Sequence, residues 1–219
     1  MSIDYTLGEE VANSVSHGIG ILFGSIAGFL LMNIALQSGN SWAVGSVSLY
    51  LFGMLTSYIT STLYHSCLHH PHRKALLRKF DHAAIYLHIA GTYSPITLIL
   101  LRNVGGWGWG LFIFVWLCAA IGLLLSFTRL KEHSHLETVC FVAMGSPILL
   151  AFQPLIEVVR PAGHMDIIWW IIAGGASYII GALFYSFRKV DYMHSVFHLF
   201  CLGGSVCHVM AIYEVLSMS

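Results

Sequence analysis

The chain has 219 residues, of which 57% are hydrophobic and only 9% are charged, and its mean hydropathy is +0.77. An ordinary soluble domain carries roughly 25% charged residues, so this composition excludes a soluble globular protein and predicts an integral membrane protein. Ten basic residues balance ten acidic ones, and this absence of net charge argues against a nucleic-acid partner.

Residues 1–17 form a polar stretch ahead of the first long apolar segment. Glu9, Asn13 and His17 recur every four residues and would share one face of a helix. This pattern favours an amphipathic segment at the membrane interface with its polar face toward the lipid headgroups, and it is also compatible with residues that support a site. We predict an interfacial segment at residues 1–17 and a transmembrane domain at residues 18–219.

Seven apolar stretches follow, each near the roughly 20 residues that a helix needs to cross a membrane. Backbone polar groups in lipid must be satisfied within the protein, and stretches of this length and continuity predict helices rather than barrel strands. The predicted fold class is an all-α integral membrane protein, a seven-transmembrane helix bundle. The spans are Gly18–Leu36, Trp42–Tyr64, Ala83–Leu101, Trp107–Phe127, Leu136–Leu155, Ile167–Phe187 and Met193–Leu216.

The basic residues are distributed unevenly between the loops. Eight of the ten Lys and Arg residues lie in the loops after the second, fourth and sixth spans, whereas Arg102 and Arg160 lie in alternate loops. Because cytoplasmic loops accumulate positive charge, we predict a cytoplasmic N-terminus and an outward-facing C-terminus. Trp107 and Trp109 would then be aromatic anchors at the outer interface.

Glycine, proline and cysteine positions bear on packing. The spacing of Gly20, Gly24 and Gly28 favours close approach of another helix. Pro95 and Pro147 lie inside predicted spans and are expected to bend them. The five cysteines include no CxxC pair, and four of them lie in apolar segments, so no disulfide framework is expected.

Five polar residues are predicted to lie at one depth in the membrane. Ser61 and His65 end the second span, and Asp81 precedes the third. His194 and His198 open the seventh. Since consecutive spans run in opposite directions, all five fall on the cytoplasmic side. Each one singly fits a hydrogen bond between helices, but polar residues in spans are costly, and their convergence favours a common functional site.

The spacing of the histidines predicts a metal site. Residues four apart in a helix are neighbours on one face, so His194 and His198 can turn ring nitrogens toward one ion, with His65 as the third ligand. Three histidines with one open position are typical of catalytic zinc. Asp81 would be a fourth ligand or would accept a proton from a zinc-bound water. Ser61 would orient His65 or hydrogen-bond a substrate carbonyl and its oxyanion.

The remaining histidines are expected to lie outside this site. Solvated side chains are expected in the two basic loops, at His69, His70, His72, His133 and His135. Cys67 follows His65 by two residues and is expected to have left the helix. His82 and His88 neighbour Asp81. His208 lies deeper in the seventh span, where an interhelical hydrogen bond is expected rather than catalysis.

These residues are similar to the motifs of the haemolysin III branch of the progestin and adipoQ receptor family. The matching segments are S-T-L-Y-H at 61–65, F-D-H at 80–82, A-G-T-Y-S-P at 90–95, H-S-V-F-H at 194–198 and the stretch 9–18. The resemblance spans the whole chain. It implies seven helices, a multipass location in the cell membrane (the inner membrane of a bacterium), and a zinc ion held by His65, His194 and His198 beside Asp81 and Ser61.

The family also contains adiponectin receptors and is related to alkaline ceramidases, which implies hydrolysis of a lipid amide. The leading hypothesis is a zinc-dependent intramembrane hydrolase of a lipid amide or ester, with a membrane lipid as substrate or ligand and Asp81 as general base and then acid. One alternative is a sensor or receptor of membrane stress or lipid homeostasis with structural zinc. Another is a haemolytic or ion-translocating protein, which would need polar residues across the whole thickness of the membrane. Beyond its cytoplasmic half, the seventh span contains mainly Ser205 and His208 as polar residues, which argues against a pore.

Overall fold

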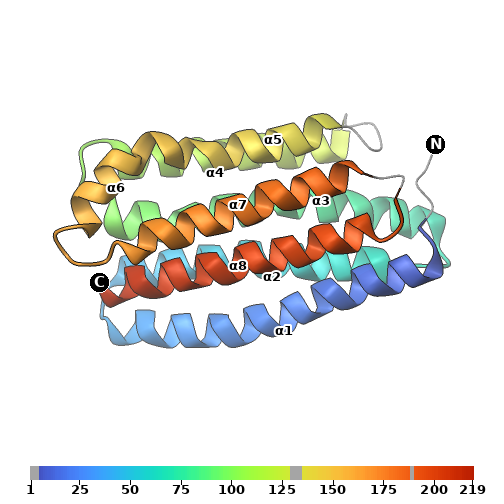
Figure 1. Ribbon diagram of the computed structural model, residues 1–219, viewed down its shortest axis with the longest axis horizontal. Coiled ribbons are helices and arrows are strands. Elements are labelled where there is room, and N and C mark those ends of the chain that lie inside the picture. The colour runs from blue at the N-terminus through green and yellow to red at the C-terminus, as the bar shows by residue number, and fades with distance from the viewer. Residues whose placement is uncertain (1–4, 129–134, 188–189) are drawn as a thin grey trace.

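The computed structural model describes residues 5–128, 135–187 and 190–219, and every regular element in these ranges is helical. The helices run along one long axis, and the start of α1 and the end of α8 lie at opposite ends of the bundle (Figure 1). Helix α1 lies along one side and the α4 and α5 pair along the other (Figure 1). The elements are α1 Leu7–Gln37, α2 Ser41–Ser66, α3 Pro71–Pro95, π-helix η1 Ile96–Leu100, α4 Trp107–Thr128, α5 His135–Gly145, 3-10 helix η2 Ser146–Ala151, α6 Phe152–Val159, α7 Asp166–Ser186 and α8 Met193–Ser217.

Seven helical segments in the described part of the chain are long and apolar enough to cross a membrane. This confirms the predicted seven-helix bundle. Helix α3 and η1 form one span, Pro71–Leu100, and α5, η2 and α6 form another, Leu136–Val159. Many large apolar side chains, such as Leu22 and Phe29, are exposed on the outside of the bundle, where a bilayer would cover them.

Helix α1 begins earlier than the first predicted span because Thr6 caps it. The Thr6 hydroxyl accepts a hydrogen bond from the Glu9 backbone N–H, and the Glu9 carboxylate accepts one from the Thr6 N–H at 2.8 Å, which is a capping box. Residues 7–17 of the stretch predicted to be interfacial are therefore part of α1. Its polar residues Glu10 and Asn13 are buried against other helices rather than turned toward headgroups, since their hydrogen-bond partners lie inside the bundle.

The connection between α2 and α3 is shorter than the sequence suggested. Pro71 occupies the first turn of α3, where its missing N–H has no helical partner to lose. The basic stretch that follows is helical rather than a loop, and Asp81 lies within α3 and faces the bundle. Cys67 lies just outside α2, as predicted.

Both prolines predicted to bend helices coincide with departures from α-helical geometry. The π-helix η1 follows Pro95, and Pro147 lies within the 3-10 helix η2. Tyr93 joins the two regions, because its hydroxyl donates to the Gly145 carbonyl at 2.7 Å and accepts from the Ile148 N–H at 3.0 Å. The tyrosine thus satisfies backbone groups that the irregular helix leaves without partners.

Small residues bring α2 close to its two neighbours. On the α1 side, a Cβ atom at Gly20 would lie 2.5 Å from the Tyr58 ring, in agreement with the predicted glycine ridge. On the α3 side, a Cβ at Gly53 would lie 2.3 Å from the Leu87 carbonyl oxygen. A Cβ at Gly91 would lie 2.7 Å from the Leu49 carbonyl oxygen. Close backbone approach of this kind is typical of membrane helix pairs, and it sets α2 beside α3 where the candidate site lies.

Gly53→Ala is expected to lower the thermal unfolding temperature of the detergent-solubilised protein. The new methyl group would meet a backbone carbonyl that cannot rotate away. Overpacking costs about 1–3 kcal/mol, which corresponds to roughly 2–12 °C in a chain of this size. Gly45→Ala, in the same helix, is the control, because a Cβ atom added there would have no described atom within 4 Å. Equal unfolding temperatures for the two variants would contradict close packing of α2 on α3.

Candidate metal centre

Three histidines converge at the end of the bundle that is predicted to face the cytoplasm. One ligand nitrogen from each of His65, His194 and His198 lies within 4.8 Å of the other two. The ring centroids are 4.5, 5.0 and 5.3 Å apart, and the ring planes are inclined to one another by 66–74°. Rings inclined in this way can direct one nitrogen each toward a common point, so the cluster could hold a metal ion. The structure thus brings together the three residues that the spacing singled out.

Glu10 fixes the orientation of His65. Its Oε2 lies 2.7 Å from His65 Nδ1, and its other carboxylate oxygen pairs with Lys74. The opposite ring nitrogen, His65 Nε2, is buried and has no hydrogen-bond partner among the described residues. Leaving a buried polar atom unpaired costs about 1–3 kcal/mol, and a histidine held by a carboxylate with its second nitrogen unused is typical of metal ligands. His65 therefore fits a metal ligand at this position.

The other two histidines are also held through Nδ1. His198 Nδ1 lies 3.0 Å from Ser16 Oγ and 3.2 Å from the Asn13 carbonyl oxygen, to which Ser16 donates its own proton. His194 Nδ1 lies 2.7 Å from the Tyr5 hydroxyl. In each ring Nε2 lies opposite these contacts and is the nitrogen that we expect to coordinate a metal. All the partners belong to α1 or immediately precede it.

Of the residues that hold the three histidines, the sequence pattern indicated only Asn13 as a possible support for a site. The polar face was read as Glu9, Asn13 and His17, but the Glu9 carboxylate is used by the capping box and by the Tyr192 N–H at 3.0 Å. The neighbouring residue Glu10 reaches His65 instead. The signal that could have found it is the T-x-x-E pattern at residues 6–9, which starts the helix early enough to turn residue 10 inward.

Asp81 and Ser61 lie beside the histidine cluster. Both side chains are buried and line the same cavity as His194 and His198. Ser61 Oγ is buried and has no hydrogen-bond partner among the described residues. His17 stacks on the His198 ring with centroids 3.5 Å apart and reaches the same cavity. The polar end of the cavity therefore combines possible ligands with a carboxyl and a hydroxyl group.

The cavity itself has a volume of about 440 Å³ and extends from the histidines into the bundle. This volume is within the usual range for small-molecule sites. Helices α3, α5, α7 and α8 supply most of its wall. Farther from the histidines the lining is largely apolar, with side chains such as Ile89, Phe141, Ile148 and Ile179.

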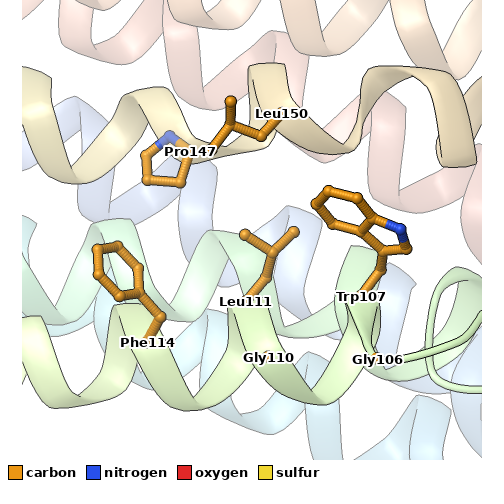
Figure 2. A pocket seen from close by; sticks show the side chains of 7 residues that line it. All are labelled: Gly106, Trp107, Gly110, Leu111, Phe114, Pro147 and Leu150. Carbon is orange, nitrogen blue, oxygen red and sulfur yellow. The ribbon is translucent and has the colours of Figure 1, made fainter.

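A second hollow of about 470 Å³ lies between the start of α4 and η2. Figure 2 shows Trp107, Leu111 and Phe114 of α4 facing Pro147 and Leu150 across it. None of the described side chains that line it is titratable. It offers hydrocarbon contact but no acid, base or ligand, so the candidate functional site is the histidine cavity.

The other histidines take different positions. His69, His70 and His72 are exposed, as predicted. His82 Nδ1 lies 2.7 Å from Glu137 Oε2 and so links α3 to α5. The structure does not describe the side chains of His133 and His135, nor those of four of the eight loop cations, Arg129, Lys131, Arg188 and Lys189.

Glu10→Gln is expected to lower metal affinity about 10- to 100-fold, because the amide cannot hold the His65 Nδ1–H as a carboxylate does. Competition with a chromophoric chelator measures this affinity directly. Glu157→Gln is the control, since Glu157 is exposed and contacts Gln153 rather than a histidine. Unchanged affinity in Glu10→Gln would show that the carboxylate does not support the ligand.

Comparison with known proteins places the chain in a family. The sequence matches the Haemolysin-III related family over residues 5–209, which include all five site residues. Hemolysin-3 of Bacillus cereus is 39% identical over 197 residues, covering 90% of this chain and 87% of that protein. The Hemolysin-3 homolog of Bacillus subtilis (strain 168) is 35% identical over 201 residues, covering 92% and 91%. The human Monocyte to macrophage differentiation factor is 27% identical, covering 96% and 86%. The chain is a multipass bacterial membrane protein and belongs to the Haemolysin-III related family.

Proposed function

We propose that this protein is a zinc-dependent intramembrane hydrolase of a lipid amide or ester. The observation that carries the proposal is the three-histidine cluster at the polar end of a largely apolar cavity, with Asp81 and Ser61 in the same wall. A metal, a carboxyl group and a hydroxyl group beside a hydrocarbon-lined space are the parts that hydrolysis of a membrane lipid requires.

Zinc is the metal proposed because the ligand set consists of imidazoles. Imidazole suits zinc, copper, iron and nickel, and a three-histidine set with an open fourth position is typical of catalytic zinc. Zinc bound there would supply a water of pKa about 7 and would polarise a carbonyl oxygen. The buried His65 Nε2, which no described residue pairs, supports this assignment.

Asp81 and Ser61 are proposed to move a proton and to hold the substrate. As general base, the Asp81 carboxylate would accept a proton from the attacking water, and as general acid it would return that proton to the leaving amine or alcohol. The Ser61 hydroxyl would donate a hydrogen bond to the substrate carbonyl oxygen as negative charge develops there. Both side chains are nearly free of contact with outside solvent, and a water-excluded site strengthens such interactions.

The apolar part of the cavity supports a lipid as substrate. A hydrocarbon chain could lie along α3, α5, α7 and α8 with its amide or ester at the histidines. Burial of each methylene contributes about 0.8 kcal/mol, so the chain would provide most of the binding free energy. The polar end would then fix which bond is placed for attack.

The names of two relatives, Hemolysin-3 and the Hemolysin-3 homolog, suggest membrane lysis as a second candidate function. One packing feature disfavours a continuous pore. At the bundle end opposite the histidines, a cluster of buried apolar side chains fills the interior, including Leu101, Leu155 and Ile167. A dye-leakage assay with lipid vesicles tests this alternative, and the hydrolase proposal predicts no leakage beyond that caused by released fatty acid.

The proposal is tested by incubating the zinc-loaded protein in detergent with ceramide-like amides and phospholipid esters. Mass spectrometry then measures the free fatty acid released. Release that depends on zinc and stops on chelation is the expected result. A protein that holds zinc but cleaves none of the panel would contradict the hydrolase and favour a sensor with structural zinc.

A further inference from the structure

A second group of polar side chains lies deeper in the same cavity. We call it the deep polar cluster, and it consists of Tyr58, His88, Tyr178, Ser205 and His208, from α2, α3, α7 and α8. At 1.5 Å per helical residue, His88 lies about 10 Å along α3 from Asp81, and His208 lies about 15 Å along α8 from His198. Four members line the cavity directly, and Ser205, which is fully buried, joins the two tyrosines.

The three hydroxyl groups of this cluster have one more proton than the hydrogen bonds between them use. Tyr58 donates to Ser205 Oγ at 2.7 Å, and Ser205 Oγ and the Tyr178 hydroxyl are 2.9 Å apart. These two hydrogen bonds use two of the three hydroxyl protons. When Ser205 donates to Tyr178, the remaining proton is that of Tyr178, which lines the cavity and can offer it to a ligand there.

The two histidines have unused ring nitrogens. His88 Nε2 and His208 Nδ1 are both buried without a hydrogen-bond partner in the described part of the chain. The other side of the His208 ring lies against α7, where a Cβ at Gly174 would fall 2.5 Å from Nε2. In the tautomer that carries its proton on Nε2, Nδ1 is a hydrogen-bond acceptor. Buried polar groups in native proteins are normally paired, so unpaired atoms from two helices indicate a ligand.

The charge of the surroundings restricts that ligand. The ionisable acidic residues of the cavity wall, Asp81 and Glu137, lie at its histidine end, and no Lys or Arg is among the described residues that line it. A charged group at the depth of the cluster would therefore lack a counter-charge in a medium of low dielectric, which is costly. The apolar side chains around the cluster require the rest of the ligand to be hydrocarbon.

We propose that the deep polar cluster is a subsite for an uncharged hydroxyl group carried partway along the hydrocarbon chain of a bound lipid. A hydroxyl can accept the spare proton of the tyrosine and serine group and donate to His88 Nε2 or His208 Nδ1. The inference rests on the proposed function in placing the lipid's polar head at the three histidines. It concerns binding, however, and does not require that the lipid be cleaved.

The test compares two fatty acids of equal chain length, one with a hydroxyl group at mid-chain and one without. Equilibrium binding to the purified, zinc-loaded protein is followed by native mass spectrometry. The hydroxy fatty acid is expected to bind roughly 3- to 10-fold more tightly, as one or two net hydrogen bonds provide. In His88→Leu and in Tyr178→Phe this preference should disappear, while affinity for the plain fatty acid stays within about twofold. His72→Leu, at the exposed start of α3, is the matched control and should keep the preference.

The outcomes separate this inference from the proposed function. Equal binding of the two fatty acids, or no binding of either, would overturn the subsite. So would a preference that survives in both His88→Leu and Tyr178→Phe, since binding of the plain chain establishes that each variant is folded. A protein that prefers the hydroxy fatty acid but releases no fatty acid from the lipid panel would support the hydroxyl subsite and contradict the hydrolase proposal.

Discussion

The double substitution His194→Ala with His198→Ala is expected to remove bound zinc, from about one equivalent per chain to background. Two of the three candidate ligands are lost, and the remaining histidine cannot hold the ion alone, because zinc sites require at least three protein ligands. Inductively coupled plasma mass spectrometry of the purified protein measures the metal content.

The matched control removes two histidines that do not approach the cluster. His69 and His72 are exposed and lie in or beside the turn between α2 and α3. His69→Ala with His72→Ala should keep the full zinc content. If the substituted cluster retained its zinc, the ion would have to lie elsewhere in the protein. Circular dichroism and size-exclusion chromatography establish that both variants remain folded.

Asp81→Asn is expected to keep zinc and to lower lipid turnover by about 10²- to 10⁴-fold. Asparagine has nearly the same shape as aspartate but cannot accept and return a proton, and loss of a general acid and base has effects of this size. The comparison of turnover with metal content is the measurement. Zinc content separates the two roles that the sequence left open for Asp81. Replacement of Asp81 would lower the zinc content if Asp81 is a ligand, but not if it only transfers protons.

Asp166→Asn serves as the control for this substitution. Asp166 is exposed at the start of α7, at the opposite end of the bundle from the histidines. Its replacement should leave turnover unchanged. Full turnover in Asp81→Asn would remove the carboxyl group from the proposed mechanism, whereas a parallel loss of zinc and turnover would make it a ligand.

Local spacing and topology predicted that three histidines of the candidate site would converge. The four-residue interval between His194 and His198 places both rings on one face of α8, and this follows from helix geometry alone. His65 and Asp81 could be added because alternating spans bring the end of one helix and the start of the next to the same depth. The large excess of apolar residues made the seven helices equally predictable.

The supporting contacts could not be obtained in the same way. Hydropathy located the start of the first span at Gly18, but the capping box starts α1 at Leu7. A helix that begins earlier turns Glu10 toward His65 and Ser16 toward His198. These contacts depend on the rotation of α1 against α2 and α8, which an apolar pattern running around most of the helix does not specify.

The cavity and the deep polar cluster depend on packing between distant segments. His88 and His208 are 120 residues apart in the chain and share a cavity because α3 and α8 both face it. The sequence suggested an interhelical hydrogen bond for His208, whereas in the structure its Nδ1 has no partner among the described residues. Which buried polar atoms remain without partners is decided by the positions of every surrounding side chain, so no local pattern predicts it.

The most direct test of the metal centre is an anomalous-difference map recorded at the zinc absorption edge from crystals of the zinc-loaded protein. We expect one peak bounded by His65, His194 and His198, with a water between the metal and Asp81. A peak with four protein ligands and no water would contradict a catalytic role. The absence of a peak among the three histidines would contradict the metal centre itself.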